Sequence, residues 1–283
     1  MPASARVPTS PHTAAQADTF PPMAVELYND GKHACIAFYD LVDGEADHAV
    51  QANQFLIVND RHGALIDPGG NMTHAGLLMA MQRYFPSRDL DYIFASHADP
   101  DIIASLNKWM VSTRCRVMIS RLWVRFLPHF TSGRDYSERT EGIPDEGMAI
   151  PLGQTHVLAL PAHFMHSEGN FQFYDPISKT LFSGDMGASM IDDDAAAEPV
   201  RDFDAHIPTM AGFHRRYMVS NKICRFWAKM VRTLDVERIV PQHGARFEGR
   251  EMVERFLRWI EELPCGVDLM TQDNYRAPPL PRG

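Results

Sequence analysis

Three residues able to bind a metal ion stand close together in the segment His97-Ala98-Asp99-Pro100-Asp101. One imidazole and two carboxylates provide the mixture of nitrogen and oxygen donors that borderline and hard divalent cations prefer. The same residues would also suit a turn at the start of a helix, where capping and the helix dipole favour acidic side chains. The segment by itself leaves both interpretations open.

Three further residues, His166, Asp185 and His243, each follow an apolar, strand-like segment and favour the metal interpretation. Strand ends on one rim of a sandwich can converge, as metal ligands must. Gly184 and Gly244 flank two of these residues and would permit backbone turns that a Cβ hinders. The sequence therefore predicts a metal site with six candidate ligands, and His163 is an alternative to His166.

The elements that must position these residues alternate between strands and helices. Apolar and β-branched runs predict strands at residues 34–41, 54–58, 64–67, 92–96, 116–120, 155–160, 169–174, 181–182 and 239–240. Helical periodicity predicts helices at residues 73–84, 102–110, 122–126, 221–234 and 250–263. Two strand-rich halves with interspersed helices predict two sheets packed face to face and covered by helices.

Composition limits the classes of partner and the domain organisation. A formal net charge of −9, without a dense block of Lys and Arg, argues against a nucleic-acid surface. The absence of a secretory signal or a long apolar run predicts a cytoplasmic protein without membrane insertion. Four scattered cysteines without CxxC spacing imply neither a disulfide framework nor a thiolate metal site. We expect a disordered leader over residues 1–22, one domain over residues 23–265 and a tail over residues 266–283.

The motif set resembles that of the metallo-β-lactamase superfamily, and most nearly that of the flavodiiron proteins and their flavodoxin-less, oxygen-binding di-iron relatives. His166 follows Asp101 by 65 residues, Asp185 follows His166 by 19, and His243 follows Asp185 by 58. These offsets are close to those of the flavodiiron pattern and favour His166 over His163. The resemblance spans residues 30–262 and implies an α+β protein with an αββα sandwich of two mixed sheets covered by helices.

The same resemblance implies how the six ligands divide between two metal ions. It assigns His97, Asp99 and His166 to the first metal and Asp101 and His243 to the second, with Asp185 bridging both.

Two positions depart from the family pattern. Asp99 stands where hydrolytic members usually have His and flavodiiron proteins have Glu, and a carboxylate favours iron or manganese over zinc. Ile102 stands where both groups typically place a metal-binding His, so the second metal would keep an open position walled by an apolar side chain. We therefore expect two iron ions, with zinc or manganese as alternatives, and a pocket suited to a small gas.

The resemblance implies a non-haem di-iron protein that binds O2, or another diatomic ligand such as NO, as a sensor or as a reductase. Only 40 residues follow His243, too few for a flavodoxin domain, so we expect no flavin in this chain. Reduction would then depend on a separate electron donor, and sensing on a signalling protein. Flavodiiron relatives imply a homodimer. Tyr217 could donate a hydrogen bond to the bound gas, or belong to an ordinary helix with solvated arginines.

Two other functions stay open. A binuclear metallohydrolase would use the same six ligands and a metal-bridging hydroxide to cleave an ester, lactone, thioester or phosphodiester. Asp99 and Ile102 favour oxygen binding over hydrolysis. A catalytically silent interaction module is less consistent with six intact candidate ligands.

Overall fold

The protein is described from a computed structural model, which covers residues 23–42, 50–191 and 193–281. The predicted leader, residues 1–22, lies outside the described residues. The boundary at residue 265 stays a prediction.

The first sheet contains seven strands in the order of the sequence. They are β1 (Met23–Asn29), β2 (His33–Tyr39), β3 (Gln54–Asn59), β4 (His62–Ile66), β5 (Tyr92–Phe94), β6 (Arg116–Ser120) and β7 (Thr140–Ile143). Neighbouring strands from β1 to β4 are antiparallel, whereas β4 to β7 are parallel. The carboxyl ends of β4, β5 and β6 therefore meet at one edge of this sheet.

The second sheet contains six strands in the order β13-β12-β11-β10-β9-β8. They are β8 (Met148–Leu152), β9 (Thr155–Pro161), β10 (Phe171–Asp175), β11 (Thr180–Phe182), β12 (Arg238–Val240) and β13 (Phe247–Glu248). β11 and β12 are parallel and the other neighbours are antiparallel. Both sheets are therefore mixed, as expected for the predicted α+β class.

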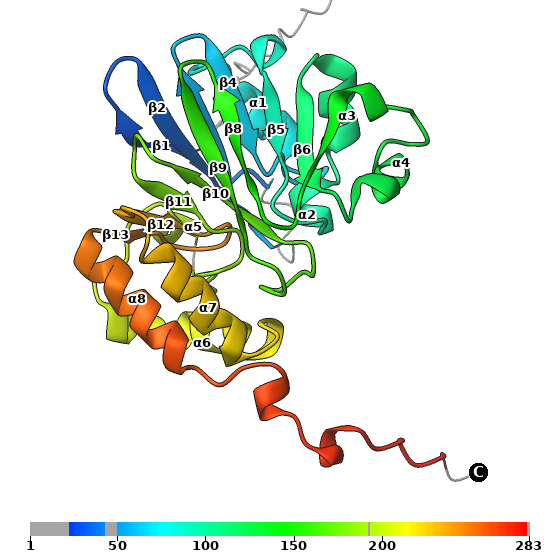
Figure 1. Cartoon of the computed structure of the whole chain (residues 1–283), viewed down its shortest axis with the longest axis vertical. Coiled ribbons are helices and arrows are strands. Elements are labelled where there is room, and N and C mark those ends of the chain that lie inside the picture. Colours follow the sequence, from blue (N-terminus) through cyan, green and yellow to red (C-terminus); the bar gives the residue numbers. More distant parts are fainter. Residues whose placement is uncertain (1–22, 43–49, 192, 282–283) are drawn as a thin grey trace, which may run out of the picture.

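Helices cover the outer faces of the two sheets (Figure 1). On the first sheet these are α1 (His74–Met81), α2 (Pro100–Ile103) and α3 (Leu106–Ser112), followed along the chain by α4 (Leu127–Phe130). The second sheet packs against α6 (Phe203–Tyr217), α7 (Asn221–Val231) and α8 (Arg250–Glu262), and a short helix α5 (Asp193–Ala196) precedes them. None of the helices in the described chain combines the length and apolar character needed to cross a bilayer.

An apolar core fills the space between the two sheets. Phe94 of the first sheet stacks on Phe173 of the second with ring centroids 4.9 Å apart, and Phe55 lies 5.0 Å from Phe182. All four rings are fully or almost fully buried, and each contributes roughly 1.5–3 kcal/mol relative to an exposed side chain. The face-to-face arrangement predicted from the strand pattern is confirmed.

The helix predicted at residues 102–110 is divided into α2 and α3. The carbonyl of Ile102 accepts a hydrogen bond from the backbone N–H of Gly69 (2.8 Å), and the N–H of Ser105 donates to the carbonyl of Gly69 (3.1 Å). These bonds to a neighbouring loop compete with the helical bonds of the same groups, which interrupts the helix. Local periodicity could not show this tertiary contact.

Candidate metal centre

Three candidate ligands occupy equivalent positions after strands of the two sheets. His97, Asp185 and His243 each lie three residues beyond the last residue of β5, β11 and β12, respectively. His166 lies in the loop after β9, which runs in the same direction as β11 because both are antiparallel to β10. A hydrogen bond from Phe171 N to Ser96 O (2.9 Å) joins the two sheets at this rim.

Asp185 lies at the centre of the site, and its two carboxylate oxygens face different imidazoles. Oδ2 is 2.7 Å from Nε2 of His166 and 3.6 Å from Nε2 of His97. Oδ1 is 3.4 Å from Nε2 of His243. This is the arrangement that a carboxylate bridging two metal ions requires.

The two remaining carboxylates complete two sets of ligands, one on either side of Asp185. The first set is His97, Asp99 and His166, and the second set is Asp101 and His243. Oδ2 of Asp99 is 3.5 Å from Nε2 of His166 and 3.8 Å from Nε2 of His97. Oδ2 of Asp101 is 3.4 Å from Nε2 of His243. The structure thus brings all six predicted side chains together. His163 instead points elsewhere, with Nε2 2.8 Å from the carbonyl of Asp145.

The donor set fits a cation. Within the described protein, Nε2 of His97 and Oδ1 of Asp185 are buried without a hydrogen-bond partner. Buried polar atoms are nearly always paired, so a positively charged ion between them would satisfy both. A set of imidazoles and carboxylates without sulfur suits iron, manganese or zinc.

The carboxylates also favour positive charge in this buried position. Burial raises the pKa of Asp185, but the neighbouring imidazoles of His166 and His243 outweigh it and hold this pKa well below its usual range. Burial lowers the pKa of His243, whereas its hydrogen bonds to Asp101 and Asp185 raise that pKa to about 10.

Hydrogen bonds behind the site fix the orientation of two imidazoles. Nδ1 of His97 lies 3.0 Å from Oγ of Ser96, and this hydroxyl donates to Oδ2 of Asp67 (2.9 Å). Nδ1 of His243 donates to the carbonyl of Gln51 (2.7 Å). In both residues Nδ1 is directed away from the site, so Nε2 is the nitrogen that would bind a metal ion, in exchange for any proton it carries.

Sequence reasoning missed these supporting residues, although Asp67 carried a signal. It is an aspartate at the end of a predicted apolar strand, immediately before Pro68-Gly69-Gly70. Burial raises the pKa of Asp67 to about 7, against the opposing hydrogen bonds from Ser96. The contact of Gln51 is made by its backbone, so no side-chain signal could have predicted it.

The loops that carry Asp185 and His243 are held in unusual conformations. Gly184 and Gly244 have φ values of +53° and +78°, as the sequence predicted, and a Cβ on Gly244 would meet Oγ of Ser189 at 2.0 Å. The side chain of Asn53 donates to the carbonyls of Pro241 and Gly244, both at 3.0 Å. These contacts leave little freedom to the backbone around His243.

Helix α6 supports the Asp185 loop through a buried histidine. Nε2 of His214 accepts a hydrogen bond from the N–H of Gly187 (2.9 Å), and Nδ1 donates to the carbonyl of Met210 (2.7 Å). Burial lowers the pKa of His214 to about 4. His214 therefore stays neutral near pH 7 and can accept this bond.

Among the cavities that border the site in the described protein, two are lined by several of the candidate ligands or their neighbours. A cavity of about 530 Å³ borders ligands of both sets, with Tyr217, Phe213 and apolar side chains such as Val50 and Met72 in its wall. A smaller one, about 390 Å³, lies beside Asp99 and His166; its wall includes the aromatic residues Trp123, Phe126 and Phe130. The ring of Tyr217 stacks on Phe213 and lies 5.4 Å from the ring of His166.

Ile102 does not take the place that we expected for it. Its side chain is fully buried in the core between the first sheet and its helices, and it is not among the residues that line the larger cavity. The cavity wall is formed instead by Pro100, Asp101 and Ala104 of the same helical segment. Because α2 turns by about 100° per residue, Asp101 and Ala104 share one face while Ile102 faces the core.

We expect Ile102→His to destabilise the fold by about 3 kcal/mol, because an imidazole would replace an apolar side chain in a dry core. Denaturant unfolding measures this change, and Ile102→Val, with an expected cost of about 1 kcal/mol, is the matched control. A stable Ile102→His variant that binds the second metal more tightly would show that this side chain can turn towards the site.

The αββα sandwich, with histidine and aspartate side chains gathered at one rim, defines a protein of the metallo-β-lactamase fold with a candidate binuclear centre. A family model described as "ODP family beta lactamase" matches residues 50–244. The chain belongs to this ODP family.

Solved structures agree with this assignment. The apo state of the chemotaxis sensor ODP from T. denticola is 40% identical, with a TM-score of 0.79; the alignment covers 90% of this chain and 99% of that one. A structure described as a peroxy diiron species of the chemotaxis sensor ODP is also 40% identical, with a TM-score of 0.78, and the alignment covers 89% and 99%. Rubredoxin oxygen:oxidoreductase from Desulfovibrio gigas shares the fold at 16% identity and a TM-score of 0.71, over 84% of this chain and 61% of that one.

A curated relative is longer than the matching region. An uncharacterized protein of Methanocaldococcus jannaschii is 24% identical over 215 residues, which is 73% of this chain and 52% of the relative. The chain thus spans about half the length of this relative.

Proposed function

We propose that this chain binds O2 at a di-iron centre and acts as an oxygen sensor. The observation that carries the proposal is the position of Asp185, whose two oxygens face His166 and His243 separately and divide six potential ligands into two sets. The similar ODP structures, described as a chemotaxis sensor and as its peroxy diiron species, support both the metal and the ligand.

Each part of the site has a defined task in this proposal. His97, Asp99 and His166 would hold one iron, Asp101 and His243 the other, and Asp185 both. Two ferrous ions held by these residues would supply the electrons for the association with O2. The second set has fewer protein ligands, and the larger cavity reaches it at Asp101 and His243. The cavity wall around Val50 and Met72 is apolar, which suits a small gas.

The decisive test is to purify the full chain anaerobically, measure its metal content, and record its absorption spectrum before and after O2 is admitted. We expect about two iron ions per chain and a new visible absorption band. Two zinc ions without a spectral response, together with turnover of a generic ester or phosphodiester, would contradict the proposal and favour a metallohydrolase.

Sensing and reduction predict different oxygen consumption. A sensor takes up O2 in proportion to its iron and then stops, whereas a reductase supplied with a separate electron donor continues to consume it. We propose the first behaviour, with the signal passed to a partner protein. Light scattering of the purified chain tests the homodimer that the resemblance implies.

We expect Tyr217→Phe to keep the iron content and to shorten the lifetime of the O2-induced absorption roughly fivefold, the effect of losing a hydrogen bond of about 1 kcal/mol. The Tyr217 ring borders the larger cavity and lies 5.4 Å from the ring of His166, which makes its hydroxyl the candidate donor to a gas bound there. Stopped-flow absorption measures the lifetime. Tyr275→Phe, at an exposed position in the C-terminal segment, is the control, and an unchanged lifetime in Tyr217→Phe would exclude this role.

A further inference from the structure

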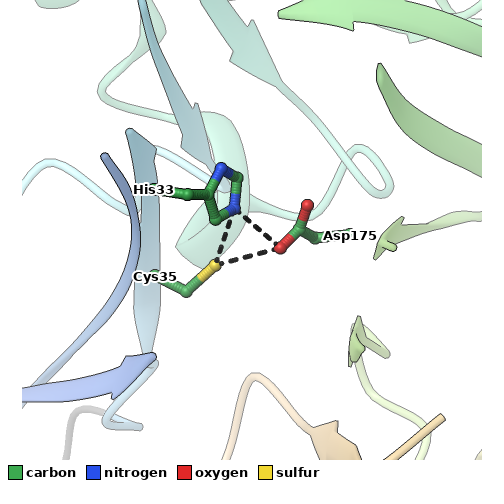
Figure 2. A group of neighbouring side chains, drawn as sticks. All are labelled: His33, Cys35 and Asp175. Carbon is green, nitrogen blue, oxygen red and sulfur yellow. Dashed lines mark hydrogen bonds and ion pairs between the residues drawn. The ribbon is translucent and has the colours of Figure 1, made fainter. Parts of the chain in front are cut away.

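A second cluster of potential metal ligands lies at the opposite end of the sandwich from the candidate metal centre. His33 and Cys35 lie on β2, and Asp175 is the last residue of β10 (Figure 2). His33 pairs with Asn59, which pairs with His62 at the start of β4. The candidate metal centre instead lies beyond the carboxyl end of β4, at Asp67.

All three side chains point into the space between the two sheets. Side chains alternate along a strand, so His33 and Cys35 share the inner face of β2 with Ala37, and Asp175 shares the inner face of β10 with Phe173. Their exposed fractions are 2% for His33 and 0% for both Cys35 and Asp175. The cluster therefore joins one sheet to the other without contact with water.

The three donor atoms surround a common point (Figure 2). Nε2 of His33 is 2.9 Å from Oδ2 of Asp175, and Sγ of Cys35 is 3.4 Å from the same oxygen and 3.8 Å from Nε2. The edges of a zinc tetrahedron, from bond lengths of about 2.0–2.3 Å, measure roughly 3.3–3.8 Å. Two of the three separations match this range, and the third would lengthen by about 0.5 Å on binding.

The hydrogen bonds of His33 indicate a positive charge between it and Asp175. The amide of Asn59 is oriented by its own bond to the carbonyl of Leu152 (2.9 Å), which turns Oδ1 towards Nδ1 of His33 at 3.3 Å. Nδ1 must then donate, so Nε2 of a neutral ring would direct a lone pair at the Asp175 carboxylate. This arrangement needs a proton or a metal ion between the two atoms.

The sulfur distinguishes a metal ion from a proton as the occupant of this cluster. A proton would serve only His33 and Asp175, whereas a metal ion would also use Sγ of Cys35. Oδ2 of Asp175 also accepts a hydrogen bond from the N–H of Ser178 (2.9 Å). Oδ1 of Asp175, which has no hydrogen-bond partner in the described protein, and Oγ of Ser178, 3.3 Å from Sγ, are the donors available for the fourth bond of a tetrahedral ion. One thiolate, one carboxylate and one neutral imidazole would balance a divalent ion, leaving no net buried charge.

We propose that His33, Cys35 and Asp175 bind a single zinc ion that links the two sheets, in a site separate from the di-iron centre. The thiolate selects zinc over the harder metals that carboxylates prefer, so the two ends of the protein bind different metals. Because the cluster is buried, the ion enters while the chain folds. Cysteine spacing gave no sign of this site, since only one cysteine takes part and Asp175 lies about 140 positions from His33 and Cys35.

The test uses the full chain produced in medium containing zinc or cobalt, with metals counted by mass spectrometry. We expect about one zinc per chain in the natural protein and in Cys115→Ser, and at least a tenfold loss of zinc in Cys35→Ser with the iron content unchanged. Cys115 is a matched control because it is also buried but lies outside the cluster.

Cobalt provides a readout that does not depend on any variant folding. Thiolate-bound Co2+ gives intense near-ultraviolet absorption, which the imidazoles and carboxylates of the candidate metal centre cannot produce. We expect this absorption in the natural protein and in Cys224→Ser. Its absence from the cobalt-loaded natural protein, or zinc content unchanged by Cys35→Ser, would overturn the proposal and identify the cluster as a buried imidazolium–carboxylate pair. Neither result bears on O2 binding.

Discussion

Asp185→Asn is expected to lower the iron content from about two ions per chain to less than one and to abolish the response to O2. An amide has one oxygen and no charge, so it cannot bridge two cations or balance their charge. In one orientation of the amide its NH2 group would face His166 and His97, and in the other it would face His243. Acceptor atoms are needed at both places. Mass spectrometry of the anaerobically purified protein and its absorption after O2 addition measure both effects.

Asp204→Asn is the control for this change, because Asp204 is an exposed aspartate that pairs with Arg255 on the surface. It should bind iron as the natural protein does. If Asp185→Asn kept two ions per chain, the bridging position assigned to this carboxylate would be wrong.

The second large effect is expected for His243→Ala, which should leave about one iron per chain and no O2-induced absorption. Only Asp101 and the shared Asp185 would then face the second position, whereas His97, Asp99 and His166 would still serve the first. The same asymmetry predicts that a chelator removes the two ions of the natural protein in two phases. Iron content and the time course of chelation measure these outcomes.

His156→Ala is a suitable control because it removes an exposed histidine from β9, away from the site. Loss of both ions in His243→Ala, with a normal His156→Ala protein, would show that the two positions are filled cooperatively. Retention of both ions would exclude His243 as a ligand.

The sequence predicted much of the fold because its strands are short apolar runs ended by turn residues. β6, for example, has the bounds that were expected, residues 116–120. β1, β7 and β8 were missed, as was most of α6. Strands β7 and β8 have exposed or half-exposed positions, so their apolar pattern is weak. Helix α6 contains Pro208, a residue that normally argues against a helix interior.

The sequence by itself determined which side chains gather at the rim. His97, Asp185 and His243 each follow the end of an apolar strand, and these strands can be recognised from their apolar runs. It also determined the turns at Gly184 and Gly244, where a positive φ suits a residue without Cβ. These features are local, since each depends on the residues directly before and after it.

Only the tertiary structure decided how these groups are used. It turned Ile102 into the core, left His163 outside the site, and placed one oxygen of Asp185 towards each set of ligands. It also brought His33 and Cys35 to Asp175, about 140 positions away in the chain. Such contacts depend on how two sheets pack and on which face of a short helix meets them, and neither is encoded in the spacing of residues along one segment.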